Sequence, residues 1–303
     1  MSIHYTSSGA SLLTRRKFLY TGGLTAAGAA VVGSVGLVES KHPVIVRIEI
    51  PLRRLPREFD GFTIAQLSDF HYEDHFSVVP IRKGVDLVNE LRPDLIVLTG
   101  DFVTVPIVEY HRGNGYRFAK NSGPCAELLS KLRAPAGVFA VLGNHDGESD
   151  PSYVVHALQR HGIPVLMNRA LPLERDKARI WLAGIDDVLE GRPDLAATLS
   201  KIPSGEVTIL LAHEPDFADQ VVFAPVDLQL AGHSHGGQIW IPGIGAPWLP
   251  QLARKYPRGF YQIGKLALYT NLGIGTIRMP VRLNCPPEVT LITLRTLEPS
   301  KRT

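Results

Sequence analysis

The sequence has few cysteines and almost no excess of one charge, and both scarcities restrict what the protein can be. Two cysteines, Cys125 and Cys285, occur among 303 residues, so a structural zinc site built from several thiolates is excluded. An exported protein could join them in one disulfide bond, but nothing in their spacing requires it. Two separate, semi-buried thiols are the simpler interpretation.

Acidic residues are absent from the first 38 positions, whereas the whole chain has 32 basic and 29 acidic residues and a net charge of +3. The basic residues Arg15, Arg16 and Lys17 lie in that acid-free segment, so the rest of the chain carries the two charges in equal numbers. A near-neutral body lacks the broad positive surface that binds nucleic acid. Only a local cationic pocket, of the kind that holds a phosphate, is compatible with this composition.

The first 40 residues are typical of a targeting segment. Thr14–Leu19 contains the paired arginines, and an uncharged run rich in glycine and alanine follows from Tyr20 to Val38. This pattern predicts a twin-arginine export signal. The alternative, a core helix, is disfavoured because five glycines lie between Gly22 and Gly36 and glycine weakens helices.

The uncharged stretch is also close to the roughly 20 residues that cross a bilayer, and no A-x-A cleavage site follows it. A cleaved signal and a retained inner-membrane anchor therefore both remain open. Either one places the body in the periplasm or cell envelope, with the twin-arginine translocase as a partner.

Residues 41–303 are predicted to form one large α/β domain, because apolar stretches of strand length alternate with segments of helical spacing. Strands are expected at residues 44–50, 62–67, 95–99, 138–142, 179–183, 207–212, 228–231, 265–270 and 289–293, and helices at 81–91, 126–132 and 152–161. Residues 103–123 are expected to be a long loop, and the proline- and glycine-rich residues 241–259 an insertion.

Polar clusters follow the ends of five of these strands. They comprise Asp69 and His71; Asp101; Asn144, His145 and Asp146; His213; and His233 and His235. In α/β sheets ligands bind beyond the carboxyl ends of the strands, so the clusters are expected to converge on one site. Their carboxylates, amide oxygen and imidazoles form a mixed ligand set that suits Mn²⁺, Fe or Zn²⁺ better than Ca²⁺. Each cluster alone is weak evidence, because an Asp or Asn after a strand is more often a cap or turn residue.

Together and in this order, the blocks resemble the motifs of the calcineurin-like metallophosphoesterase superfamily. The resemblance implies a four-layer α/β fold, in which a β-sandwich of two sheets is flanked by helices, and a site for two divalent metal ions (Mn, Zn or Fe). It also assigns the ligands: Asp69, His71 and His235 to one metal, Asn144, His213 and His233 to the other, and Asp101 as the bridge.

The same resemblance implies that His145 is a catalytic residue that faces the scissile phosphate instead of a metal. We expect His145 to donate a proton to the leaving oxygen, and Asp146 to orient it. Two metals about 3.5–4 Å apart generate a nucleophile from water and neutralise charge on the phosphoryl group. The sequence therefore predicts a dinuclear metal-dependent phosphoesterase.

Longer motifs resemble a bacterial subfamily of twin-arginine-exported envelope phosphoesterases, which includes UDP-diacylglucosamine pyrophosphatases of lipid A biosynthesis. The motifs are Leu98–Phe102, Ala212–Asp216, Gly232–Gln238, Gly273–Gly275 and Pro280–Arg282. They favour a phosphodiesterase or pyrophosphatase that acts on a lipid-linked or nucleotide-linked substrate such as UDP-2,3-diacylglucosamine. The alternatives are a phosphomonoesterase or phosphoprotein phosphatase, and a non-catalytic cell-wall metal-binding protein.

Two further features bear on the substrate. The insertion Ile241–Leu252, with Trp240 and Trp248, is either an apolar lip for a lipid or a loop folded onto the body. Arg278 and Arg282 are either a pair that holds a second phosphate by bidentate hydrogen bonds or solvated arginines at the end of a strand.

Overall fold

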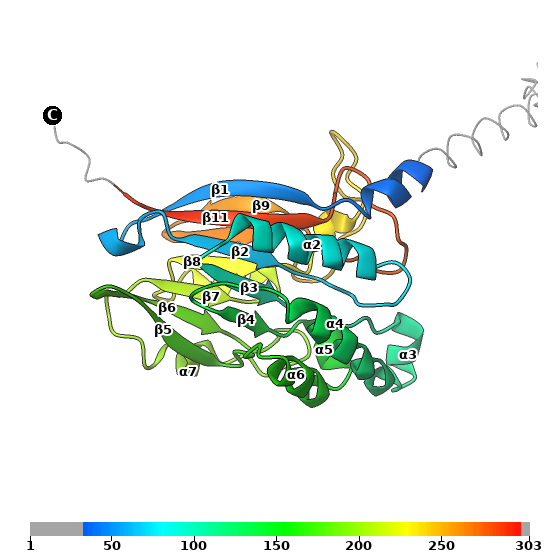
Figure 1. Ribbon diagram of the computed structural model, residues 1–303, viewed down its shortest axis with the longest axis horizontal. Coiled ribbons are helices and arrows are strands. Elements are labelled where there is room, and N and C mark those ends of the chain that lie inside the picture. Colours follow the sequence, from blue (N-terminus) through cyan, green and yellow to red (C-terminus); the bar gives the residue numbers. More distant parts are fainter. Residues whose placement is uncertain (1–32, 298–303) are drawn as a thin grey trace, which may run out of the picture.

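The computed structural model describes residues 33–297, so most of the predicted export signal lies outside the described residues. The strands form two sheets, with the orders β1-β11-β2-β3-β4 and β5-β6-β7-β8-β10-β9, and helices lie on the outer faces of both (Figure 1). The expected β-sandwich of two sheets flanked by helices is therefore confirmed.

The first sheet carries the first three polar clusters. Its strands are β1 (Val44–Leu52), β11 (Glu288–Thr296), β2 (Thr63–Leu67), β3 (Leu95–Thr99) and β4 (Val138–Val141). Neighbouring strands are parallel except for β11 and β2. Because β2, β3 and β4 run the same way, the residues that follow them meet at one edge of the sheet.

The second sheet carries the remaining clusters. Its strands are β5 (Arg169–Arg175), β6 (Ala178–Gly184), β7 (Thr208–Leu211), β8 (Leu228–Ala231), β10 (Leu266–Thr270) and β9 (Gly259–Ile263). The four central strands are parallel, and β5 and β9 pair antiparallel at the two edges. The ends of β7 and β8 therefore also meet at one edge.

Apolar contacts hold the layers together. Between the sheets, Ile64 and Val97 belong to the same buried cluster as Leu230, and each fully buried side chain of this size contributes about 1.5–3 kcal/mol. On the outer face of the first sheet lie α2 (Val78–Leu91), α4 (Ser122–Leu129) and α6 (Pro151–Arg160). On the outer face of the second lie α7 (Leu195–Leu199), η3 (Pro215–Phe217) and α8 (Ala218–Val221).

The structure adds elements that the sequence pattern did not indicate. The expected loop 103–123 contains α3 (Ile107–His111) and η2 (Gly115–Asn121), and a short η1 (Arg57–Phe59) follows β1. The edge strand β5 was missed because Pro172 and several charged residues interrupt its apolar pattern, which an edge tolerates. Strand β9 was missed because its residues are only half-buried or exposed.

The two cysteines are separate, buried, free thiols, which confirms the simpler interpretation. Cys125 lies on the buried face of α4, whereas the thiol of Cys285 contacts the carbonyl of Gly236. Within residues 33–297, the helices are all too short or too polar to cross a membrane.

Candidate metal centre

Tight turns after the strands bring the polar clusters together. Five of the predicted ligands have left-handed backbone conformations, with φ between 44° and 66°: Asp69, His71, Asp101, His233 and His235. Such conformations cost about 1–3 kcal/mol each and persist only where the surrounding structure enforces them. Here the turns bond to one another, since Asp69 N donates to Gly100 O at 2.9 Å and His71 N to Asp101 O at 3.0 Å.

Two glycines allow these turns to approach closely. A Cβ atom on Gly143 would collide with the carboxylate of Asp101, and one on Gly232 would collide with Ser68 and the carboxylate of Asp69. Any larger residue at either position would therefore push the turns apart.

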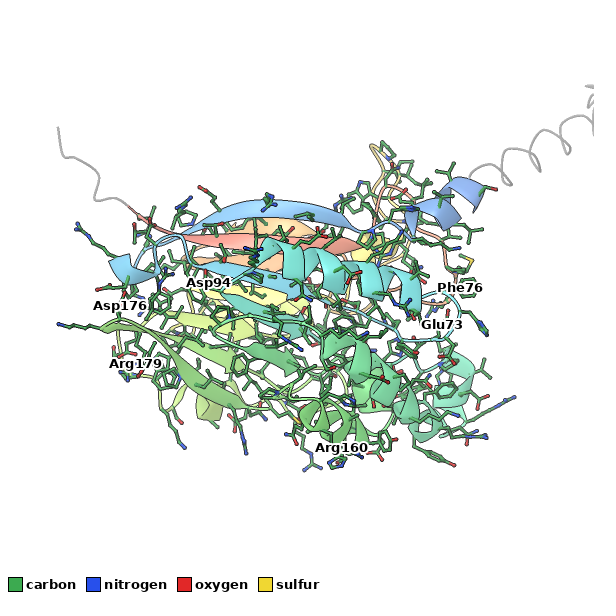
Figure 2. The ribbon with its side chains drawn as sticks, viewed as in Figure 1. Glu73, Phe76, Asp94, Arg160, Asp176 and Arg179 are labelled. Atoms are coloured by element: carbon green, nitrogen blue, oxygen red, sulfur yellow. The ribbon has the colours of Figure 1, made fainter. Side chains whose placement is uncertain are left out.

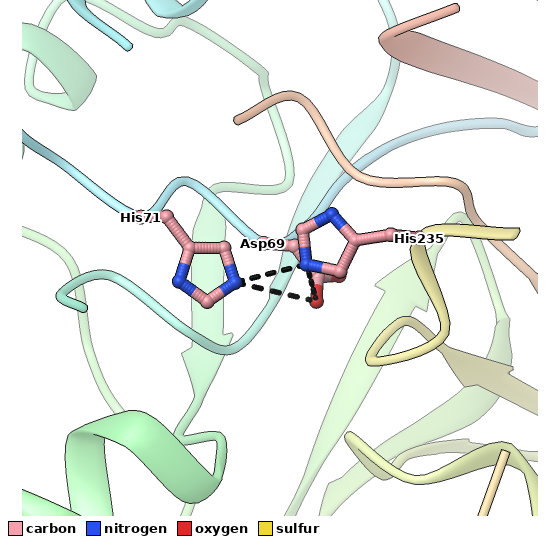
Figure 3. Close-up of side chains that lie close together, drawn as sticks. All are labelled: Asp69, His71 and His235. Carbon is pink, nitrogen blue, oxygen red and sulfur yellow. Dashed lines mark hydrogen bonds and ion pairs between the residues drawn. The ribbon is translucent and has the colours of Figure 1, made fainter. Parts of the chain in front are cut away.

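The first group of donors is formed by Asp69, His71 and His235, all of them buried (Figure 3). His235 Nε2 lies 3.2 Å from Asp69 Oδ1 and 2.9 Å from His71 Nε2. Burial opposes ionisation of Asp69, but the neighbouring imidazoles of His235 and His213 hold its pKa below the usual range. Burial also holds the pKa of His71 well below its ordinary value, so this imidazole is neutral and able to bind a cation.

The second group is formed by Asp101, His213 and His233, and Asn144 lies beside it. Asp101 Oδ2 is 3.2 Å from His213 Nε2 and 3.5 Å from His71 Nε2 of the first group. The other oxygen, Asp101 Oδ1, accepts a hydrogen bond from the backbone of His145 at 2.9 Å. The single atom Oδ2 therefore faces both groups, which is the placement that a bridging ligand requires.

Three of the imidazoles, those of His71, His213 and His233, are oriented by contacts of their second nitrogen with neighbouring oxygens. His71 Nδ1 contacts Thr104 Oγ1 at 3.1 Å, and His213 Nδ1 contacts Thr99 O at 2.6 Å. His233 uses the opposite nitrogen, because its Nε2 lies 2.8 Å from Gln251 O and only Nδ1 is left for the centre. Partners of this kind fix the ring and the tautomer of metal-binding histidines.

The donors also pass a test of fit for cations. Among the described residues, Asn144 Oδ1 is buried without a hydrogen-bond partner, which is costly unless something binds there. His71 Nε2 and His235 Nε2 lie 2.9 Å apart, close enough for one cation to contact both. The structure thus brings six of the seven predicted ligands into two adjoining groups, with Asn144 beside the second.

His145 lies beside the first group, with its ring centroid 5.1 Å from that of His71. Its Nδ1 is 2.9 Å from Glu148 Oε2 and 3.2 Å from the backbone nitrogen of Val105. Burial would lower the pKa of His145, but the carboxylates of Asp101 and Glu148 outweigh it and raise the pKa. An imidazole with a raised pKa in this position can carry a proton and donate it to a leaving group.

Asp146 does not orient His145, contrary to the sequence prediction. Its Oδ1 accepts hydrogen bonds from the backbone of Phe102 and Val103 at 2.9 and 3.2 Å, and its Oδ2 from Gly143 at 3.0 Å. Burial raises the pKa of Asp146 to about 7. Asp146 therefore joins the turn after β3 to the turn after β4.

Glu148 takes the place that was expected for Asp146. It lies at the end of α5 (Asn144–Glu148), and its other oxygen, Oε1, accepts from Asn144 Nδ2 at 3.3 Å. One carboxylate thus contacts both Asn144 and His145. The sequence signal for this role was the spacing of Glu148, which is three residues after His145 and four after Asn144, because residues so spaced share one face of a helix. A helix was not expected at this position, so the signal was missed.

Arg282 is fully buried, which is neither of its two predicted placements. Its guanidinium donates to four carbonyl oxygens, those of Leu272, Gly273, Gly275 and Cys285, and Nη2 lies 3.2 Å from His235 Nδ1. A guanidinium with its donors engaged in this way is not available to a phosphate. Arg278, in contrast, is exposed and lies over the ring of Trp248, 4.7 Å from its centroid.

A cavity of about 690 Å³ opens over the two groups of donors. Its floor includes Asp101, Asn144, His145 and the imidazoles of His71, His233 and His235, and its walls are largely apolar, with Ile107, Val108, Ile277 and Met279. Trp248 of the insertion also lines it, so the insertion forms a lip of the cavity. The end of the insertion also folds onto the body, because His233 Nε2 lies 2.8 Å from Gln251 O and Asp216 N donates to Leu252 O at 2.9 Å.

Comparison with known proteins agrees with this geometry. Residues 62–237 match the model of the calcineurin-like phosphoesterase family. The metallophosphoesterase YkuE of Bacillus subtilis strain 168 is 36% identical over 93% of this chain and 98% of its own length. The phosphodiesterase YaeI of Escherichia coli K12 is 30% identical over 93% of this chain and 100% of its own length. A transmembrane protein with a metallophosphoesterase domain from Danio rerio is 30% identical over 88% of this chain and 61% of its own length.

The chain belongs to the calcineurin-like phosphoesterases and is a metal-dependent phosphoester hydrolase. The family is dinuclear, and the donors described above would hold the two cations, with Asp101 between them. When bound, such cations act as Lewis acids and lower the pKa of water to give a nucleophile at neutral pH. The non-catalytic alternative is thereby set aside.

Proposed function

We propose that the protein is a phosphodiesterase or pyrophosphatase that acts at the cell envelope on a lipid-linked or nucleotide-linked substrate, for example UDP-2,3-diacylglucosamine. The observation that carries this proposal is the cavity above the donors. Its volume lies within the range of about 300–1,000 Å³ that is typical of sites for organic ligands, and is far more than a phosphate needs. Its apolar walls favour a phosphorus centre that carries a large organic group.

Different residues of the cavity have different proposed roles in the reaction. The donors of the floor face the phosphoryl group, and His145, held by Glu148, is placed to give a proton to the leaving oxygen. Arg278 stands at the mouth, where its guanidinium could bind a second phosphate of a pyrophosphate by paired hydrogen bonds. YaeI, which shares the whole length of the fold, is named a phosphodiesterase, and this supports an ester of two organic groups.

The location at the envelope rests on the paired arginines Arg15 and Arg16 and the uncharged run that follows them. The name of the relative from Danio rerio, a transmembrane protein, is consistent with work near a membrane. A folded, metal-loaded enzyme is the cargo that the twin-arginine route accepts.

Turnover of matched esters tests the reaction class. The purified protein is loaded with Mn, Zn or Fe in turn, its metal content is measured, and kcat/KM is compared for bis-p-nitrophenyl phosphate and p-nitrophenyl phosphate. We expect the diester to be preferred. Preference for the monoester would instead establish the phosphomonoesterase or phosphoprotein phosphatase alternative.

The substrate class is tested in the same samples. UDP-2,3-diacylglucosamine is compared with UDP-N-acetylglucosamine, which presents the same pyrophosphate without long acyl chains. We expect the acylated compound to be hydrolysed with the higher kcat/KM, because only its chains use the apolar walls. Equal kcat/KM values for the two compounds would show that the acyl chains are not recognised, and would leave the proposed diesterase activity unaffected.

A further inference from the structure

We infer that the mouth of the cavity is a membrane-docking surface, which seats its apolar side chains in a lipid bilayer. This surface, called the apolar rim below, consists of Phe76, Ile107, Val108, Ile244, Trp248 and Met279. The inference deepens the proposed function and rests on it for the lipid-linked substrate, whereas the docking itself rests on separate observations.

The first observation is the number of large apolar side chains that face water around one opening. Ile244 is 78% exposed, and the other five residues of the apolar rim are between 41% and 57% exposed. They come from four separate segments, and all except Ile244 line the cavity. Exposed apolar residues are usually scattered singly, so a ring of them around a site marks an interaction surface.

The apolar rim also lies at one end of the molecule. Phe76 is seen there in Figure 2, on the loop that leads into α2, whereas Asp176 and Arg179 of the β5–β6 hairpin lie at the opposite end. This is the end at which β2, β3 and β4 finish, so the donors lie just behind the rim.

Hydrogen bonds hold the rim segments in this outward position. The side-chain amide of Gln238 donates to Ile277 O at 3.0 Å and accepts from Ile277 N at 2.6 Å, which fixes the segment that carries Met279. The Ile241 N–H donates to Gly245 O at 2.9 Å and closes the turn that presents Ile244. The exposure of these side chains is therefore built into the fold.

The second observation identifies the occupant as a bilayer. A helix over residues 33–39 is fastened beside the rim, because Arg282 N donates to Gly36 O at 3.1 Å and Cys285 N donates to Glu39 Oε1 at 2.9 Å. Arg282 and Cys285, which bond to this helix, follow Met279 closely in the chain. Figure 1 shows this helix, in dark blue, at the same end as α3 and the yellow insertion.

That helix ends the uncharged run that begins at Phe18, which has about the length that crosses a bilayer. Val35 and Val38 on the helix are themselves largely exposed. A bilayer that holds this run is therefore brought to the apolar rim. Trp248 stacked under Arg278 is also a pairing suited to the boundary of a membrane, where the ring is partly in lipid and the cation reaches water.

Fluorescence quenching by lipid tests the inference on the full chain. The protein is reconstituted in vesicles of phosphatidylglycerol and a phosphatidylcholine that is brominated on its acyl chains. Trp181 is buried and Trp240 is partly buried, so Trp248 is the residue expected to meet the bromines. We expect the brominated vesicles to quench emission strongly, and the variant Trp248→Phe to lose most of that quenching.

A matched control places the same fluorophore at the other end of the molecule. Phe223 is 90% exposed and follows Val222, which packs beside Gly264 in the turn before β10 begins. In Trp248→Phe combined with Phe223→Trp, the new tryptophan should remain unquenched. Ile244→Ser, outside the cavity lining, should reduce the quenching of Trp248 several-fold, whereas Phe223→Ser should not.

Three results would overturn the docking surface: an unquenched Trp248 in bilayers, equal quenching of a tryptophan at position 223, or self-association of the protein that Ile244→Ser abolishes. The last result would show that a second copy covers the rim. Quenching needs neither metal nor turnover. Loss of hydrolysis of lipid-linked substrates with quenching intact would therefore reject the proposed function alone.

Discussion

At the scale of single residues, Asp101 connects the two groups of donors. Its Oδ2 faces His71 and His213, and its Oδ1 is held by the backbone of His145. In Asp101→Asn, a neutral amide cannot serve two cations as a carboxylate does. We expect metal content to fall towards one ion per chain, and kcat/KM to fall roughly 10²–10³-fold with the lost charge stabilisation. Elemental analysis and assay of the same sample check this, and full activity with two ions bound would contradict the bridging role.

His145 is predicted to act on the leaving group. His145→Ala should keep both metals and nearly normal substrate affinity, while kcat falls by roughly 10²–10⁴-fold on esters with alkoxide or nucleoside leaving groups. The loss should be smaller with p-nitrophenolate, which leaves without a proton. Equal losses on both kinds of ester would assign His145 to stabilisation of the phosphoryl oxygens instead. Loss of metal from the His145→Ala variant would show that His145 is a metal ligand.

Glu148 should act through His145, because its carboxylate lies 2.9 Å from the imidazole Nδ1. We expect Glu148→Ala to lower kcat by about 10–100-fold on poor leaving groups, the usual effect of removing a partner that orients a functional imidazole. Glu148→Gln, which keeps an oxygen for Asn144, should recover part of the loss.

A double-mutant cycle distinguishes this positioning role from a general effect on the site. In a His145→Ala background, Glu148→Ala should cost little more, since the residue it positions is already absent. Glu109→Ala is the matched control, because the Glu109 carboxylate bonds to Arg112 at 2.9 Å and to Asn114 at 3.1 Å, away from His145. Additive losses from Glu148 and His145 would exclude the positioning role.

At the scale of elements, the segment from Leu272 to Cys285 folds around one buried cation. Arg282→Met would leave the carbonyls of Leu272, Gly275 and Cys285 without their donor, at about 1–3 kcal/mol for each unsatisfied group, whereas Gly273 O keeps its bond from Glu288 N. We expect the free energy of unfolding to fall by about 3 kcal/mol or more, and Arg282→Lys to restore only part of it. Urea unfolding of metal-free protein measures this. Arg278→Met, at an exposed position of the same segment, should unfold as the unaltered chain does.

Most strands and the convergence of the ligands could be predicted from the sequence. The apolar run Leu95–Thr99 is short and completely buried, and the rule that sites form beyond parallel strand ends needs only the order of elements. The burial of Arg282 could not be predicted, because its acceptors come from backbone up to ten residues away. The role of Glu148 was missed because Asp146, nearer to His145, looks equally suitable in sequence. Its carboxylate is instead engaged by Phe102 and Val103.

At the scale of the whole molecule, the export route is a prediction on its own. Arg15→Lys combined with Arg16→Lys preserves the charge of the N-terminal segment, so a mechanism that reads charge alone would still export the protein. If the twin-arginine translocase recognises the two arginines themselves, we expect the variant to stay in the cytoplasm, folded and active. Fractionation with an activity assay of each compartment decides between the two, and an unchanged envelope fraction would rule out this route.

The position of β11 determines when the first sheet can be completed during synthesis. Among the described strands it is synthesised after all the others, yet it lies between β1 and β2 and is the only partner of β1 within the first sheet. Until residues 288–296 have left the ribosome, β1 has no place to pair and β2 has an open edge. The sheet that carries Asp69, Asp101 and Asn144 is thus completed only after residues 288–296 have been synthesised. We expect the metals to be bound after these residues have been made, an order that is compatible with the predicted export route for folded proteins.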